Sequence, residues 1–264
     1  MGFRCGIVGL PNAGKSTLFN ALTRAAVPAE NYPFCTIEPN TGVVEVPDER
    51  LSGIAQLSQP EKLIPTVMEF VDIAGLVAGA SRGEGLGNRF LGHIREVDAI
   101  AHVVRGFQRV DVSHVEGRID PVADIETIDT ELALADLETL ERALDRAGRA
   151  AKTGDMAERE RERVFAAACS AINSGVGLKT LGAGAAELLR PLCLLTVKPM
   201  LFVVNVEEGV MESDAVVAVE SHAKAVGAEA IAVNAPIEQE IAGLAAVSYT
   251  HLRAHETDSY LICR

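Results

Sequence analysis

Residues 9–16 read GLPNAGKS, from Gly9 to Ser16, and they match the pattern G-x-x-x-x-G-K-[ST] of a phosphate-binding loop. The loop follows the apolar run Cys5–Val8 and precedes the helix-forming stretch Ser16–Thr23, which is the strand–loop–helix context that the pattern requires. Glycines in such a loop let backbone N–H groups surround the β-phosphate, and the helix N-terminus adds the positive end of its dipole. The predicted phosphate site comprises Asn12, Ala13, Gly14, Lys15, Ser16 and Thr17. Within it, Lys15 is expected to reach the β- and γ-phosphates as a catalytic residue, and the Ser16 hydroxyl to bind Mg²⁺.

The chain contains six short apolar runs of the kind that form buried strands, including the one before the loop. Helix-forming segments separate several of them, and this alternation is typical of a mainly parallel sheet with helices on both faces. The predicted fold class is therefore α/β, a P-loop NTPase with a mainly parallel sheet. The six runs are Cys5–Val8, Val43–Val46, Val67–Val71, Ile100–Val104, Leu201–Val204 and Ile231–Val233.

The pattern changes between residues 120 and 195, where strand signals are few. Apolar residues recur there every three or four positions, first from Ile125 to Ala135 and, after a two-residue slip, from Leu137 to Ala147. A break at 153–155 precedes another apolar stripe from Val164 to Ile172. We interpret this region as an inserted α-helical coiled-coil hairpin, and the alternative is two further helices packed on the sheet. The nucleotide-binding domain then comprises 1–119 and 196–246.

Asp72 ends one of the predicted strands and begins the pattern Asp72-Ile73-Ala74-Gly75. An acid at the carboxyl end of a strand beside the phosphate loop can hold Mg²⁺ through water, and Gly75 can donate its N–H to the γ-phosphate. Thr36 lies between Ser16 and Asp72 and can supply a second hydroxyl when a triphosphate is bound. The predicted metal ligands are therefore Ser16, Thr36 and, through water, Asp72.

Composition narrows the possible partners and surroundings. The formal net charge is -13, so general attraction to a nucleic-acid backbone is unavailable and no direct DNA binding is expected. No apolar run approaches the ~20 residues that span a bilayer, so no membrane partner is expected. The five cysteines form no C-x-x-C pair, which argues against a zinc site or a disulfide framework and predicts a cytoplasmic protein.

Four segments together resemble the YchF family, the Obg-like ATPases. They are GLPNAGKSTLFNALT from Gly9, NYPFCTIEPNTGVV from Asn31, EFVDIAGLVAGASRGEGLGNRFL from Glu69 and VVNVEE from Val203. The resemblance runs from Met1 to about Leu244. It implies a nucleotide-binding domain interrupted by a helical insertion, Mg²⁺ held by Ser16 and Thr36, association with the ribosome, and activation by K⁺ through Asn12.

The base-reading segment departs from that of ordinary GTPases, whose N-K-x-D pattern grips guanine with a carboxylate. Here the residues are Asn205-Val206-Glu207-Glu208, so valine replaces the lysine and the longer glutamate replaces aspartate. The resemblance therefore favours adenine, with Asn205, the backbone near Val206 and Glu208 at the base, and predicts that ATP binds better than GTP. Asn234-Ala235-Pro236 replaces the usual small residues of a second base loop, which leaves the individual base contacts open.

Hydrolysis requires an oriented water, and Ras-like enzymes use a Gln directly after D-x-x-G. This chain has Leu76 there, which cannot hydrogen-bond water, and the resemblance offers His114 as the catalytic replacement. We expect an ATP-preferring, Mg²⁺-dependent enzyme that hydrolyses slowly as a switch. The alternatives are a nucleotide-binding regulator with negligible hydrolysis, a GTP-preferring GTPase, and a small-molecule kinase, which would lack the D-x-x-G and N-x-x-E patterns.

The last residues depart from the family altogether. Family members continue into a C-terminal TGS domain, which we expect to be absent here. Residues 247–264 do not resemble the family and are interpreted as translated sequencing read-through joined to a truncated reading frame.

Overall fold

A computed structural model describes residues 2–24, 40–73, 86–107, 120–152 and 154–243, and the segment 247–264 lies outside them. Its centre is a six-stranded sheet in the order β2-β3-β1-β4-β5-β6. Only the pairing of β2 with β3, at one edge, is antiparallel among these strands. The mainly parallel α/β sheet predicted from the sequence is confirmed. The strands are β1 (Phe3–Val8), β2 (Thr41–Glu45), β3 (Val67–Asp72), β4 (Ala99–Arg105), β5 (Met200–Asn205) and β6 (Glu229–Val233).

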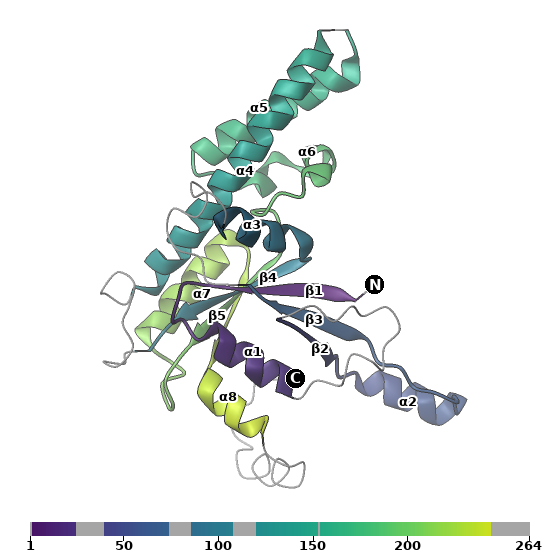
Figure 1. Cartoon of the computed structure of the whole chain (residues 1–264), viewed down its shortest axis with the longest axis vertical. Coiled ribbons are helices and arrows are strands. Elements are labelled where there is room, and N and C mark those ends of the chain that lie inside the picture. The colour runs from purple at the N-terminus through teal and green to yellow at the C-terminus, as the bar shows by residue number, and fades with distance from the viewer. Residues whose placement is uncertain (1, 25–39, 74–85, 108–119, 153, 244–264) are drawn as a thin grey trace.

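Helices cover both faces of the sheet (Figure 1). On one face, α1 (Lys15–Arg24) and α8 (Ala235–Ile241) pack over a core that includes Ile7, Leu18 and Val103. On the other, α3 (Leu86–Glu96), α4 (Pro121–Ala151) and α7 (Asp214–Val226) cover the even-numbered residues of β4 and β5. A short helix, α2 (Glu49–Ser58), projects from the connection between β2 and β3.

The inserted region forms a helical hairpin that extends away from the sheet (Figure 1). Asp120 caps α4 by accepting a hydrogen bond from the Ala123 N–H, and Asp155 caps α5 (Met156–Asn173) in the same way through the Ala157 N–H. The chain returns to β5 through η2 (Leu178–Leu181), α6 (Ala183–Leu189) and η3 (Arg190–Leu192). The predicted pair of helices on either side of 153–155 is confirmed.

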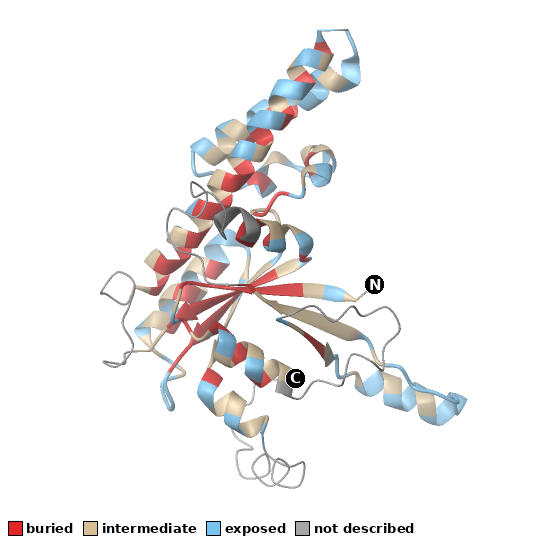
Figure 2. Ribbon diagram, in the orientation of Figure 1, coloured by how far each residue is buried: buried red, intermediate tan, exposed pale blue. Residues whose placement is uncertain are grey.

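The buried stripe of α4 is continuous, so the predicted two-residue slip is wrong. Buried positions recur along the whole helix (Figure 2). Asp136 occupies one of them, and none of its surface is exposed. The apolar pattern seemed to slip because an aspartate occupies a position where the helical period requires a buried residue. The sequence left two interpretations open, a helical hairpin and helices packed on the sheet, and each describes one half of α4. Its first half packs on the sheet, and its second half packs on α5.

Among the described helices, none combines the length and apolar character that crossing a membrane requires.

Candidate nucleotide site

The phosphate-binding loop lies at the carboxyl edge of the sheet, between β1 and α1. In open α/β sheets, ligands bind at this edge because the loops after parallel strands converge there. Backbone geometry in the loop favours small or flexible residues: Gly14 has φ 96° and Asn12 has φ 64°. A Cβ on Gly9 would lie 2.4 Å from the Val103 carbonyl oxygen, and one on Gly14 would lie 2.1 Å from the Asn205 amide nitrogen. Gly9 is therefore required by the close approach of the β4 backbone, and Gly14 by the close approach of the Asn205 side chain at the end of β5.

Lys15 is held inside this loop. Its side chain is 7% exposed, and its Nζ donates a hydrogen bond of 2.9 Å to the carbonyl oxygen of Leu10. Burial lowers the pKa of Lys15, while the nearby carboxylate of Asp72 opposes that shift. An ammonium withdrawn from water but still next to a carboxylate is suited to bind phosphate oxygens, because its charge is poorly screened.

Ser16 and Asp72, two of the predicted metal ligands, are brought together. The Ser16 hydroxyl donates a hydrogen bond of 3.2 Å to Oδ2 of Asp72, although 56 residues separate them in the sequence. The other carboxylate oxygen of Asp72 is buried without a hydrogen-bond partner among the described residues. A hydroxyl and a carboxylate with one unengaged oxygen form a donor set that suits Mg²⁺, and proteins with this fold generally use Mg²⁺.

Asn205 joins the phosphate loop to the loop after β6. Its Nδ2 donates to the carbonyl oxygen of Ala13 at 3.0 Å, and its Oδ1 accepts from the Ala235 N–H at 3.1 Å. The side chain is 3% exposed. Sequence reasoning predicted Asn205 at the base, and it missed this second role. The neighbouring Asn234 is also engaged, because its Oδ1 caps α8 by accepting from the Ile237 N–H.

The other residues predicted to contact the base differ in their surroundings. The Val206 side chain is buried in a cluster with Phe202 and Val216, and its N–H donates to the Val233 carbonyl oxygen. A lysine at 206 would therefore bring its ammonium into an apolar interior. Glu208, by contrast, is exposed and accessible to a ligand.

Two buried polar residues of β4 were missed by sequence reasoning, because they lie in an otherwise apolar strand. His102 is buried against the Phe202 ring, whose centroid also lies 5.7 Å from that of the His222 ring. Desolvation, followed by the charges of His222 and Lys15, lowers the pKa of His102 to about 3. At the end of the strand, the Arg105 guanidinium lies over the Phe107 ring and donates to its carbonyl oxygen. The only feature of the sequence that could have pointed to them is a basic residue within an otherwise apolar strand pattern.

Four residues with predicted roles lie outside the described residues: Thr36, Gly75, Leu76 and His114. Asn12 and Thr17 lie on the phosphate loop and the first turn of α1, as predicted from the motif.

Comparison with known proteins identifies relatives that cover most of the chain. A family model described as 50S ribosome-binding GTPase matches residues 4–143. The chain is 53% identical over 247 residues to the ribosome-binding ATPase YchF of Haemophilus influenzae, covering 92% of this chain and 68% of that one. It is 48% identical over 250 residues to the Bacillus subtilis protein of the same name, with the same coverage. The solved YchF GTPase of Schizosaccharomyces pombe superimposes with a TM-score of 0.83 at 30% identity, covering 99% of this chain and 73% of that one.

Proposed function

Because the chain belongs to the YchF family of ribosome-binding ATPases, we propose that it binds ATP at the carboxyl edge of its sheet and hydrolyses it as a slow, ribosome-associated switch. The observation that carries this proposal is the Ser16–Asp72 pair beside the buried ammonium of Lys15. Together they supply the cation-binding and phosphate-binding groups of a triphosphate site. The cytoplasm is the compartment in which such a protein meets ribosomes.

The loop residues have distinct roles in the proposed reaction. Backbone N–H groups from Asn12 to Ser16 surround the β-phosphate, and Lys15 exchanges its bond to Leu10 for the phosphate oxygens. Ser16 and Thr36 would hold Mg²⁺ directly and Asp72 would hold it through water. The ion supplies neutralisation of charge on the β- and γ-phosphates when bound. Gly75 donates its N–H to the γ-phosphate.

Water activation is assigned to His114, since Leu76 has no polar group with which to orient water. Asn12 would admit K⁺ as a second cation beside the phosphates. Slow intrinsic hydrolysis is expected because the residue directly after the D-x-x-G pattern, Leu76, cannot orient a water. Single-turnover hydrolysis with and without ribosomes tests this, because a regulator with negligible hydrolysis would show no turnover in either condition.

The base is proposed to be adenine, with GTP as the weaker ligand. Glu208 reaches about one methylene farther than the aspartate that grips guanine, so its carboxylate is displaced from the guanine N1–H and N2–H donors. The second candidate is GTP, since the solved relative from Schizosaccharomyces pombe is called a GTPase. Calorimetric titration with ATP and GTP side by side separates the two. Tenfold tighter binding of GTP would reverse the assignment.

The domain organisation proposed for this function keeps 1–119 and 196–246 as the nucleotide-binding domain and 120–195 as the helical insertion. The first half of α4 shares its core with the sheet. The hairpin, which extends from the body of the protein, supplies a surface for the ribosome at a distance from the nucleotide.

A further inference from the structure

The long helix α4 belongs to two structural units at once. It runs without interruption for 31 residues, from Pro121 to Ala151. Its first half buries Ile125, Ile128 and Leu132 against the sheet and α3. Its second half packs on α5 through Leu140, Ala143 and Ala147. A tilt of the first half is therefore carried directly into the hairpin, since a continuous helix has no joint at which to absorb it.

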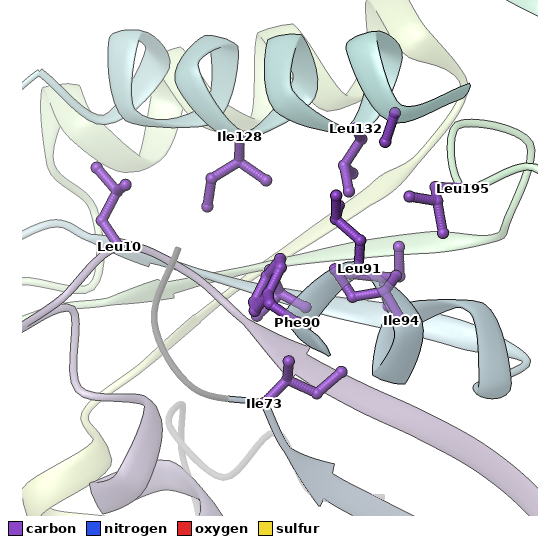
Figure 3. Close-up of a cluster of buried hydrophobic side chains, with 11 residues drawn as sticks. Leu10, Ile73, Phe90, Leu91, Ile94, Ile128, Leu132 and Leu195 are labelled. Carbon is purple, nitrogen blue, oxygen red and sulfur yellow. The ribbon is translucent and has the colours of Figure 1, made fainter. Parts of the chain in front are cut away.

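The nucleotide site contacts the first half of α4 through one hydrophobic cluster (Figure 3). Leu10, whose carbonyl oxygen accepts the Lys15 hydrogen bond, and Ile73, which follows Asp72, are both buried in it. Ile128 and Leu132 of α4 belong to the same cluster, and both are fully buried. Because protein interiors are close-packed, a displacement of Leu10 or Ile73 is passed to α4 through this cluster, which also contains Phe90 and Leu91 of α3.

The point where α4 leaves the sheet is fixed by buried polar contacts. Asp136 accepts hydrogen bonds of 2.8 Å from the N–H groups of Leu195 and Thr196 and from the Thr196 hydroxyl. Next to it, Arg95 at the end of α3 donates to the Thr139 hydroxyl at 3.1 Å. These contacts tie α4 both to the helix that precedes β4 and to the segment that leads into β5. These hydrogen bonds therefore fix the position of α4 relative to α3 and to the segment before β5.

From this arrangement we infer that α4 couples the nucleotide to the hairpin: the positions of Leu10 and Ile73 set the tilt of α4, and the hairpin tip moves with it. The inference rests on the proposed function, because it requires that ATP and ADP occupy the site. About 15 residues of α4 extend beyond Asp136, or roughly 22 Å, so a tilt of about 8° moves the tip by about 3 Å. Linkage makes the effect reciprocal, and a partner that holds the hairpin must change nucleotide affinity by the same factor.

The test measures the distance between the hairpin tip and the body of the protein. Spin labels are placed at Met156, 74% exposed at the start of α5, and at Val217, 57% exposed on α7, with the other accessible cysteines replaced by serine. Pulsed dipolar spectra are recorded on the full chain with MgADP and with a non-hydrolysable ATP analogue. Calorimetry on the same samples gives the affinity of each nucleotide.

Two variants separate transmission through α4 from an effect on the site itself. Glu138→Gly with Glu141→Gly introduces flexibility at exposed positions directly beyond the junction, and Glu138→Ala with Glu141→Ala is the matched control. We expect the alanine pair to show a shift of about 3 Å between nucleotides. The glycine pair should keep nucleotide affinity within twofold and lose more than half of that shift.

Two results would overturn the coupling: identical distances with both nucleotides bound in the alanine pair, or an undiminished shift in the glycine pair. If neither nucleotide binds the alanine pair or the unsubstituted chain, calorimetry shows that the proposed function itself is wrong, and the coupling is withdrawn with it.

Discussion

Replacing Asn205 with alanine tests whether this residue holds the nucleotide site together before any nucleotide arrives. The substitution removes two hydrogen bonds, of 3.0 Å to the Ala13 carbonyl oxygen and of 3.1 Å from the Ala235 N–H. Both backbone groups lie against a side chain that is 3% exposed, so water cannot readily replace it. An unsatisfied buried group costs ~1–3 kcal/mol. Some relaxation is expected, and the two groups together predict a loss of ~2–4 kcal/mol in the free energy of unfolding.

Asn234→Ala is the matched control, because Asn234 lies directly before Ala235 and its side chain only caps α8. Losing this cap is expected to cost ~1 kcal/mol without touching the phosphate loop. Urea unfolding without nucleotide measures both losses, and calorimetry with MgATP measures both affinities. Asn205→Ala should lose ~2–4 kcal/mol of stability and weaken ATP binding at least tenfold, whereas Asn234→Ala should lose only the ~1 kcal/mol of its cap.

The alternative is that Asn205 acts only on the base. In that case, Asn205→Ala would weaken ATP binding while the nucleotide-free protein unfolded at the wild-type urea concentration. A loss below ~0.5 kcal/mol, smaller than one ordinary hydrogen bond, would refute the structural role.

Five further substitutions test the site and its surroundings. Lys15→Ala should abolish triphosphate binding and Ser16→Ala should weaken only its Mg²⁺-dependent part; unchanged affinity in both, measured by calorimetry, would contradict the phosphate site. The folded pKa of His102, about 3, lies below the unfolded value near 6.5, so the unfolded chain binds more protons between these values. The contribution of His102 to stability should therefore decrease as the pH is lowered from 6.5 toward 3, by up to ~1.4 kcal/mol per pH unit. Burial raises the pKa of Asp129, on α4, to about 6, so its contribution to stability has the opposite sign and is lost as the pH rises through about 6. Urea midpoints measured across this pH range should lose the His102 dependence in His102→Leu and the Asp129 dependence in Asp129→Asn. If both variants keep the wild-type pH profile, neither residue contributes to the pH dependence of stability. Glu208→Asp should shift preference toward GTP by about tenfold, because the shorter carboxylate can reach the guanine donors, and an unaltered ATP/GTP ratio would remove Glu208 from the base site.

The fold class and the strand–loop–helix setting of residues 9–16 could be predicted from the sequence because local rules govern them. A glycine-lysine-serine loop after an apolar run specifies strand, loop and helix by spacing alone. The pairing of Ser16 with Asp72 was also predictable, since the carboxyl ends of neighbouring parallel strands meet at one edge of the sheet. In each case the deciding information lies within a few residues or follows from the strand order of an α/β sheet.

Only the tertiary structure could decide what buried polar side chains contact. Asp136 interrupts the apolar period of α4, and its partners lie 59 and 60 residues away, so the periodicity was misread as a slip. Asn205 engages Ala13 from 192 residues away, and the Val206 side chain is buried in the core. A sequence pattern records whether a side chain is apolar, but the partner of a buried polar group depends on how distant segments are packed together. For that reason the sequence alone determined the α/β fold and the phosphate loop, whereas the packing of β5, β6 and α4 decided how that loop is held and how the hairpin is joined to it.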